Sequence, residues 1–191
     1  MREVVLIFAR APRLGAVKRR LARGVGARAA LRFHCAMLDD LARASRADRR
    51  LRPILMLTPD RARLRLRVRL PVLPQGGGDL GARMARAVRR FPRRRVFIIG
   101  CDIPGAGPAD IHAALRALGR ADAVFGPAED GGYWLVGFGP RRPARPFQDV
   151  RWSTRHALAD TVRNFAGQRV AFLPPRRDVD TAEDLWTIGQ R

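Results

Sequence analysis

The stretch Val96-Phe97-Ile98-Ile99-Gly100-Cys101-Asp102-Ile103-Pro104 places a carboxylate directly after an apolar run. Short apolar runs bounded by glycine and proline are typical of buried strands, so a strand is predicted over Arg95–Ile99. Asp102 would follow at the carboxyl end of this strand, where open α/β sheets bind their ligands. A hard oxygen ligand there could hold Mg²⁺ or Mn²⁺ against a pyrophosphate. The competing interpretation is that Asp102 only stabilises a turn before a proline.

Other predicted strands alternate with helices along the whole chain. Strands or short extended pieces are expected over Glu3–Phe8, Pro53–Leu57, Pro71–Leu73, Ala123–Phe125, Tyr133–Phe138 and Val170–Leu173. Helices are expected over Val17–Arg23, Ala27–Arg46, from Asp79 to Phe91, over Pro108–Leu118, from a cap at Ser153 or Thr154 to Phe165, and after a capping box at Thr181–Asp184. This alternation predicts an α/β fold with a mostly parallel sheet, a three-layer α/β/α sandwich forming one domain over residues 1–191.

One segment fits two kinds of structure, and one predicted helix has a clear packing face. In the segment 61–70, arginines alternate with small or apolar residues, which fits a strand, although arginine and leucine also favour helices. Its structure is left open. In the helix expected over Ala27–Arg46, helical spacing predicts a packing face formed by Leu31, Cys35, Leu38 and Leu41.

The composition favours a folded protein of the cytoplasm. The chain has 191 residues, of which 47% are hydrophobic, enough for the core of one domain. No apolar stretch approaches the length needed to cross a bilayer, and no signal peptide is expected, so membrane insertion is not predicted. The two cysteines, Cys35 and Cys101, cannot build a disulfide framework and suit a reducing compartment.

The net charge of +21 makes a nucleic-acid-binding protein without catalysis one candidate. However, Lys18 is the single lysine among the 38 basic residues, and the arginines are spread along the whole chain. This pattern is typical of a GC-rich genome rather than of a DNA-binding surface. Nucleic acid is therefore the less favoured partner.

The loop after the first strand carries a concentration of positive charge. It runs from Ala9 through Gly15 to Lys18 and includes Arg10 and Arg13. Loops that lead from a strand into a helix favour phosphate, because backbone N–H groups and the positive end of the helix converge there. The loop matches neither a Walker loop nor a Rossmann glycine fingerprint, and an ordinary basic turn is the alternative.

Two acidic segments further along the chain could complete such a site. Asp178 and Asp180 precede the last predicted helix, where Asp180 could be a second metal ligand or a helix cap. Glu129 and Asp130 stand beside paired glycines between two predicted strands. Either could serve as a general base toward an acceptor, while a tight turn explains the same residues equally well.

A glycine-rich turn offers a competing fold. Gly76, Gly78 and Gly81 form a G-x-G-x-x-G pattern, and Asp102 at the end of the next strong strand could bind the ribose of a dinucleotide. The strand that precedes these glycines is short and flanked by prolines, which argues against this interpretation. His34, His112, His156, Cys101, Trp152 and Trp186 are assigned to packing or to the surface.

Six motifs, in this order, resemble a family of bacterial GT-A-fold nucleotide-diphospho-sugar transferases, some of which are assigned to arsenosugar biosynthesis. The motifs span Phe8 to Leu185 and read FARAPRLGAVKRRLA, PQGGGDLGARM, IIGCDIP, GPAEDGGYWLVG, VRWST and DVDTAEDL. The same fold is similar to that of the molybdopterin and phospholactate guanylyltransferases. The chain departs from the family at Arg19, where threonine is common, and at Cys101–Pro104, where a Ser-Asp-Cys-Pro-like segment is usual.

The resemblance implies a role for each matching segment. The first loop would hold the nucleotide phosphates through Ala9, Arg10, Ala11, Pro12, Gly15 and Lys18. The glycine-rich turn would shape the base and ribose pocket through Gln75, Gly76, Gly81 and Arg83. Asp102, with Asp180 as a partner, would bind the metal, and Asp130 would lie on the acceptor side.

The predicted function is a metal-dependent glycosyltransferase that uses a nucleotide-diphospho-sugar and a small-molecule acceptor. Asp102, Asp130 and Lys18 are its predicted catalytic residues, and Mg²⁺ or Mn²⁺ its predicted cofactor. The alternative is nucleotidyl transfer, in which a phosphorylated acceptor attacks a nucleoside triphosphate and releases pyrophosphate.

Overall fold

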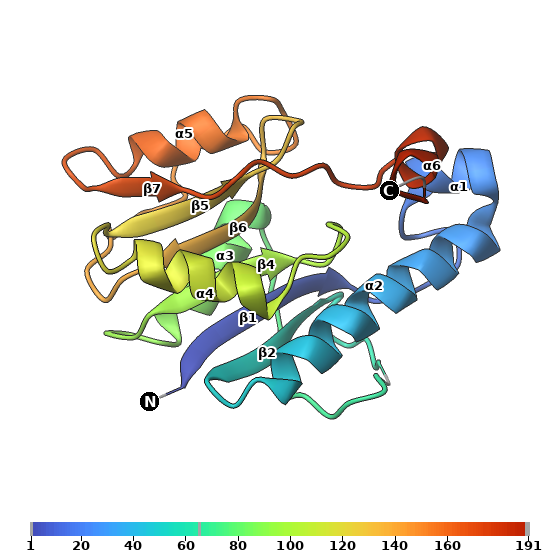
Figure 1. Ribbon diagram of the computed structural model, residues 1–191, viewed down its shortest axis with the longest axis horizontal. Helices are drawn as coiled ribbons and strands as arrows, with labels where there is room; N and C mark the ends of the chain where they lie inside the picture. The colour runs from blue at the N-terminus through green and yellow to red at the C-terminus, as the bar shows by residue number, and fades with distance from the viewer. Residues whose placement is uncertain (1, 65, 190–191) are drawn as a thin grey trace.

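The computed structural model describes residues 2–64 and 66–189, and its centre is one seven-stranded sheet (Figure 1). The strand order is β3-β2-β1-β4-β6-β5-β7. The strands are β1 Glu3–Arg10, β2 Leu51–Thr58, β3 Val72–Pro74, β4 Val96–Gly100, β5 Ala123–Pro127, β6 Tyr133–Phe138 and β7 Val170–Phe172. Only β6 runs antiparallel to its neighbours, β4 and β5, among the strands described. The predicted mostly parallel sheet is confirmed.

Helices cover both faces of the sheet, which confirms the three-layer α/β/α arrangement. The helices are α1 Arg19–Val25, α2 Ala27–Ala47, α3 Leu80–Arg89, α4 Pro108–Ala117, α5 Ala157–Arg163 and α6 Ala182–Gly189. Helices α2 and α4 pack on one face, and α3 and α5 on the other. Helices α1 and α6 lie together beyond the sheet, at the right of Figure 1. No described helix is long and apolar enough to cross a membrane.

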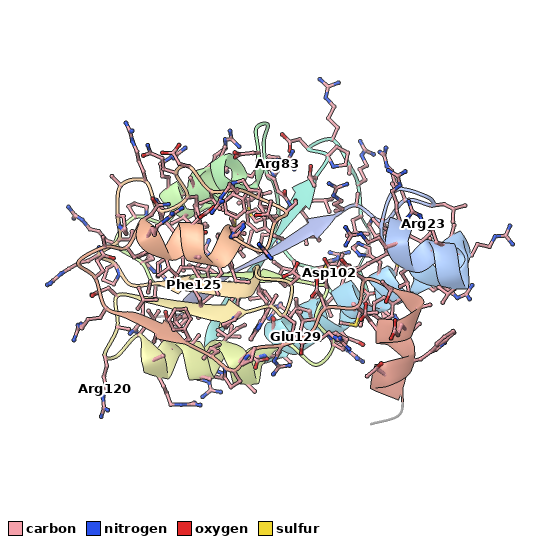
Figure 2. The ribbon with its side chains drawn as sticks, turned by 90° about the horizontal axis from the view of Figure 1, so that it is seen from above. Arg23, Arg83, Asp102, Arg120, Phe125 and Glu129 are labelled. Carbon is pink, nitrogen blue, oxygen red and sulfur yellow. The ribbon has the colours of Figure 1, made fainter. Side chains whose placement is uncertain are left out.

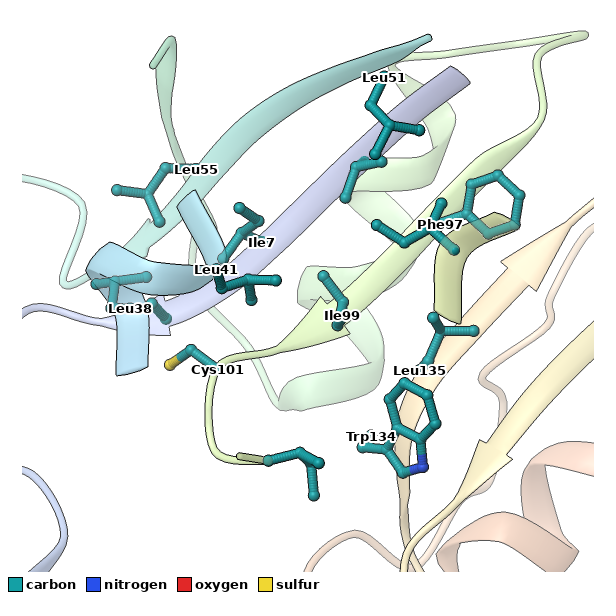
Figure 3. Close-up of a cluster of buried hydrophobic side chains, with 14 of the residues drawn as sticks. Ile7, Leu38, Leu41, Leu51, Leu55, Phe97, Ile99, Cys101, Trp134 and Leu135 are labelled. Carbon is teal, nitrogen blue, oxygen red and sulfur yellow. The ribbon is translucent and has the colours of Figure 1, made fainter. Parts of the chain in front are cut away.

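The two faces of the sheet form two separate halves of the core. In Figure 3, Leu38 and Leu41 of α2 lie over Ile7 and Ile99 on one face. The opposite face holds a cluster around Phe125, with other aromatic side chains packed edge to face against it. Because the central strands are covered on both sides, successive residues point into one half and then the other. Continuous apolar runs in the sequence follow from this arrangement.

The packing face predicted for α2 is wrong by one position. Leu38 and Leu41 are buried as expected, but Ala30 and His34 are buried in place of Leu31 and Cys35. The physical reason is a hydrogen bond of 3.0 Å between His34 Nε2 and the carbonyl of Arg10, which turns His34 toward the end of β1. A polar side chain therefore occupies a place that an apolar pattern assigned to its neighbours.

The segment 61–70 is neither helix nor strand in its described residues. Its alternation nevertheless has a structural counterpart, because the apolar members Ala62, Leu64, Leu66 and Leu70 are half-buried against the core. Arg65 lies outside the described residues. Its described residues form a loop that packs on the core and do not belong to the sheet.

The two helix caps predicted near the C-terminal half have different outcomes. The capping box at Thr181–Asp184 is confirmed, with the Asp184 N–H donating to Thr181 Oγ1 and the Thr181 N–H donating to Asp184 Oδ2. The cap at Ser153 or Thr154 is wrong, because α5 begins only at Ala157, after His156. The intervening residues form turns, and Ser153 has a φ of 60°.

The dinucleotide-binding alternative is also wrong. In such a fold, the strand before the glycine-rich turn pairs with the strand that carries the ribose-binding acid. Here β3 lies at the edge of the sheet, and β2 and β1 separate it from β4. The glycines therefore belong to a turn at the edge of the sheet.

Close packing of α1 against α6 gives a testable consequence. A Cβ atom at Gly24 would lie 2.6 Å from the Cβ of Ala182. Helix propensity alone would favour alanine over glycine by about 1 kcal/mol, but overpacking costs about 1–3 kcal/mol. Gly24→Ala is therefore expected to lower the free energy of unfolding, measured by urea denaturation. Gly24→Ala/Ala182→Gly removes the clashing methyl group and should recover the loss, and a Gly24→Ala variant as stable as the wild type would contradict the described packing.

Candidate active site

Lys18 reaches the carboxyl ends of the central strands from the loop that follows β1. Its backbone has φ 48° and ψ 48°, the left-handed conformation, immediately before α1. This conformation costs a residue other than glycine about 1–2 kcal/mol, so the surrounding contacts must hold it. Its side chain is only 5% exposed, and its ammonium lies 2.9 Å from Asp102 Oδ1 and 3.0 Å from Asp180 Oδ1.

The two carboxylates come from distant parts of the chain. Asp102 follows β4, and Asp180 precedes α6. The Val179 N–H donates to the backbone carbonyl of Asp102, and buried Val179 anchors the segment beside it. The Asp180 N–H donates to Asp184 Oδ2. The capping box of α6 therefore also fixes the direction in which Asp180 enters the site.

Electrostatics keep Lys18 charged in this position. Burial alone would lower the pKa of its ammonium, but the charges and hydrogen bonds of Asp102 and Asp180 outweigh burial and raise the pKa above its ordinary value. Each carboxylate is also nearly half exposed, so both stay accessible to solvent. A buried, permanent positive charge thus stands between two carboxylates.

A cavity of about 820 Å³ opens beside this triad. Of the residues predicted to bind the nucleotide or the metal, seven line it: Ala9, Arg10, Lys18, Gln75, Arg83, Asp102 and Asp180. Ala11, Pro12, Gly15, Gly76 and Gly81 do not line it. The cavity also brings Arg19 and Arg20 to the same wall, so its entrance is strongly basic.

Two of the predicted residues that do not line the cavity, Gly76 and Gly81, have structural roles in the glycine-rich turn. Gly81 packs so closely that a Cβ there would lie 2.9 Å from both Trp152 and the Phe147 carbonyl. Gly76 has a φ of 81° and leaves room for the guanidinium of Arg86, which donates to the Gln75 carbonyl. These two glycines shape the turn, and neighbouring residues of the turn line the larger cavity.

Gln75 is the residue of this turn that reaches the centre of the fold. Its side chain is 4% exposed, and its amide donates to the carbonyls of Ala9 and Met56 at 3.1 and 2.8 Å. It therefore ties the carboxyl ends of β1 and β2 together beneath the cavity. Asp79 caps the following helix, α3, by accepting from the Ala82 N–H at 2.7 Å.

Asp130 lines a second cavity, of about 410 Å³, that meets the first at Asp102. It lies in the β5–β6 hairpin, where its Oδ1 accepts from the Gly132 N–H at 2.8 Å. The turn interpretation of this segment is confirmed, and the same turn directs Asp130 to a cavity wall. Asp178 lines this cavity as well, and burial, with the nearby charges of Asp130 and Asp180, raises the pKa of its carboxyl.

Several residues of the cavity walls were not predicted from the sequence. Trp152 and Ser153 line both cavities, and Thr58 and His34 line the larger one. Trp152 was assigned to packing, and it does pack on Tyr133, at 6.3 Å between ring centroids. The signal that could have found this segment is VRWST, which belongs to the family resemblance but has no chemistry of its own.

Ion pairs between a buried carboxylate and two exposed arginines hold that segment in place. Asp160 of α5, whose side chain is 1% exposed, accepts from Arg151 at 2.8 Å and also from Arg163. Arg151, first among these partners, holds the pKa of the Asp160 carboxyl well below its usual range. Because Arg151 directly precedes Trp152, the pair fixes the backbone that separates the two cavities.

His34, Cys101 and Asp102 form another group of potential metal ligands, with one ligand atom from each within 4.8 Å of the others. Burial strongly raises the pKa of the Cys101 thiol, so the thiolate that a soft metal needs is disfavoured. His34 bonds the Arg10 carbonyl through Nε2, and its Nδ1 has no hydrogen-bond partner among the described residues. For a hard divalent ion, Asp102 and Asp180 are the better matched pair.

The three arginines labelled in Figure 2 do not share one surface. Figure 2 shows Arg23, Arg83 and Arg120 on well-separated parts of the molecule. Asp102, in contrast, lies toward the middle, between the sheet and the α1–α6 pair. This distribution of charge favours ligand binding in the cavities over binding along an extended basic stripe.

The described geometry has clear relatives among known structures. A protein described as a nucleotide-diphospho-sugar transferase from Desulfovibrio desulfuricans G20 is 30% identical, with a TM-score of 0.89 over 98% of this chain and 87% of that one. The 4-diphosphocytidyl-2C-methyl-D-erythritol synthase of Anaerococcus prevotii DSM 20548 is 11% identical (TM-score 0.58, 100% and 99% covered). A Mycobacterium tuberculosis H37Rv protein in complex with manganese is 19% identical (TM-score 0.57, 97% of each chain). The last two likenesses show a shared fold.

The family assignment rests on sequence as well as on structure. No curated protein matches the sequence. The model of a family described as "Uncharacterized protein conserved in bacteria (DUF2064)" matches residues 37–154, which is more than half of the chain. The chain therefore belongs to this bacterial family, and it is a transferase with the fold of the nucleotide-diphospho-sugar transferases.

Proposed function

We propose that the chain transfers a sugar from a nucleotide-diphospho-sugar to a small acceptor with the help of Mg²⁺ or Mn²⁺. The observation that carries this proposal is the meeting of Lys18, Asp102 and Asp180 at the junction of two cavities. The larger cavity has a basic wall suited to a diphosphate, and the smaller one offers space for a second substrate. The 30% identical relative, described as a nucleotide-diphospho-sugar transferase, supports the same class of donor.

The residues present fit a divalent ion. The ammonium of Lys18 lies between Asp102 and Asp180 at contact distance from both, so this place already stabilises a cation. Both carboxylates offer hard oxygen atoms, and Mg²⁺ is usually held by one or two carboxylates together with phosphate oxygens. When bound, the ion would neutralise charge on the departing diphosphate.

The chain's own residues take the remaining roles. Lys18, Arg10 and Arg83 would bind and orient the diphosphate in the basic cavity. An acceptor hydroxyl in the smaller cavity would attack the sugar carbon, the bond from that carbon to the diphosphate oxygen would break, and a nucleoside diphosphate would leave. Asp130 would accept the hydroxyl proton.

A thermal-shift screen with nucleoside triphosphates and nucleotide sugars, each with and without Mn²⁺, tests the proposal. A ligand at 100 times its Kd stabilises the folded state by about 2.7 kcal/mol, which for a chain of this size raises Tm by about 5–10 °C. We expect nucleotide sugars with Mn²⁺ to give the largest rise.

The products then decide between the two transfer reactions. Release of a nucleoside diphosphate from the donor supports sugar transfer, whereas release of pyrophosphate from a triphosphate would show nucleotidyl transfer. If no nucleotide raises Tm with or without Mn²⁺, both assignments are wrong.

A further inference from the structure

The wall of the smaller cavity differs in charge from the rest of this protein. Eighteen residues line it, and the charged ones are Asp102, Asp130 and Asp178. Among the described residues, no lysine or arginine belongs to this wall. In a chain with 38 basic residues out of 191, about one in five, a wall of this size would ordinarily carry three or four. The larger cavity next to it carries five, so the sign of the charge changes at Asp102.

The arginines near the smaller cavity form ion pairs or ring contacts with residues outside its wall or away from its carboxylates. Arg177, next to Asp178, pairs with Glu129 at 3.0 Å, and Arg151 pairs with Asp160. Arg176 lies over the ring of Trp134 and pairs with Asp110. Arg155, although exposed, does not line the cavity. Among the described ion pairs, Asp130 and Asp178 have no basic partner, whereas Asp102 pairs with Lys18.

The rest of the wall is apolar and aromatic. Tyr133 and Trp152 contribute aromatic surface from one half of the core, Trp134 lies in the other half, and Ile103 and Met84 contribute further apolar surface. Trp152 packs on Tyr133 at a ring angle of 69°, and Trp134 is almost fully buried. Flat apolar faces beside carboxylates suit molecules that combine C–H surfaces with hydroxyl or amino groups, because carboxylates accept hydrogen bonds from both.

We propose that the smaller cavity is an acceptor site that selects uncharged or amine-bearing hydroxylated molecules and rejects phosphorylated or carboxylated ones. That the bound molecule is the acceptor rests on the proposed function, but the exclusion of anions follows from the charges of the cavity wall. A phosphate in this cavity would face Asp130 and Asp178 without a compensating cation of the wall, while Lys18 of the larger cavity already pairs with Asp102. A phosphorylated acceptor, which the nucleotidyl-transfer alternative requires, is therefore disfavoured.

The experiment measures the sign of the potential inside each cavity with a reporter cysteine. Thr154→Cys places a thiol in the smaller cavity, and Thr58→Cys places one in the larger cavity. Both variants carry Cys35→Ser, because Cys35 is partly exposed, while Cys101 is buried. Each thiolate is reacted with a trimethylammonium-bearing and a sulfonate-bearing ethyl methanethiosulfonate; it attacks the sulfur, forms a mixed disulfide and releases methanesulfinate. The ratio of the two rates at one site cancels the pKa of that thiol, and division by the same ratio for 2-mercaptoethanol cancels the intrinsic difference in reactivity between the reagents.

We expect this normalised cation-to-anion ratio to be about 10 for Thr154→Cys, since one charge at 4 Å alters a rate about fivefold even in bulk water. For Thr58→Cys it should lie below 1. The overall charge of +21 favours the anionic reagent everywhere, so a preference for the cation at position 154 must be local. Adding Asp130→Asn and Asp178→Asn should bring the ratio toward 1.

A ratio at or below 1 for Thr154→Cys, or one that Asp130→Asn and Asp178→Asn leave unchanged, would overturn the proposal. Folding is checked by thermal melting, and Ala128→Cys, in the same wall, replaces Thr154→Cys if that variant does not fold. Labelling needs no nucleotide. Its outcome is therefore independent of the screen that tests the proposed function.

Discussion

Asp102→Ala is expected to weaken Mn²⁺ binding about 100-fold or more and to reduce sugar transfer at least as much. Asp102 supplies one of the two carboxylates that hold a cation at the junction of the cavities. Loss of groups that only support a metal ligand already costs about 10–100-fold in affinity or activity, so loss of a ligand itself should cost at least as much. Mn²⁺ binding is measured by electron paramagnetic resonance of the free ion, with a nucleoside diphosphate present.

Asp40→Ala is the matched control for this variant. Asp40 lies on α2, is mostly exposed and pairs with Arg43, so it removes the same charge away from the cavities. It should bind Mn²⁺ like the wild type. If folded Asp102→Ala retains the affinity of the wild type for Mn²⁺, Asp102 is not a metal ligand.

Lys18→Gln is expected to change metal and nucleotide binding in opposite directions. Without nucleotide, the ammonium of Lys18 competes with any divalent ion for Asp102 and Asp180. Its removal should therefore tighten Mn²⁺ binding to the free protein. Nucleoside diphosphate binding should weaken about 10–100-fold, because a hydrogen bond to a charged group contributes about 1.5–3 kcal/mol. Isothermal titration with each ligand alone measures both changes.

Arg23→Gln serves as the control for the metal titration, because Arg23 is exposed on α1, the helix that follows Lys18, and makes no contact with either carboxylate among the described ion pairs. It should alter Mn²⁺ affinity only slightly. An equal increase in both variants would mean that net charge, rather than the position of Lys18, governs metal binding. Weaker Mn²⁺ binding in Lys18→Gln would show that the ammonium does not occupy the place of the ion.

Local patterns were sufficient to predict the central strands and the acid that follows β4. The run Val96–Ile99 is apolar throughout because β4 is buried on both faces, and glycine and proline mark its end. The carboxyl end of such a strand is a ligand site by topology alone. Lys18 stood out because the composition holds no other lysine.

Features that depend on tertiary contacts could not be predicted. His34 replaces an apolar residue on the buried face of α2 only because the Arg10 carbonyl lies opposite. The turn before α5 depends on the pairing of Arg151 with Asp160. The absence of basic residues from the wall of the smaller cavity likewise depends on which partners the arginines find. Contacts between side chains from distant segments produce no periodic pattern in a sequence.

The position of Asp180 has a consequence for biosynthesis. Lys18 and Asp102 are translated before Asp180, the second carboxylate partner of Lys18, whose orientation depends on Asp184 and on the docking of α6 against α1. A nascent chain can form the sheet up to β6 while its ammonium–carboxylate cluster is still incomplete. Competence to bind a metal–diphosphate complex should thus arise only after this segment has left the ribosome.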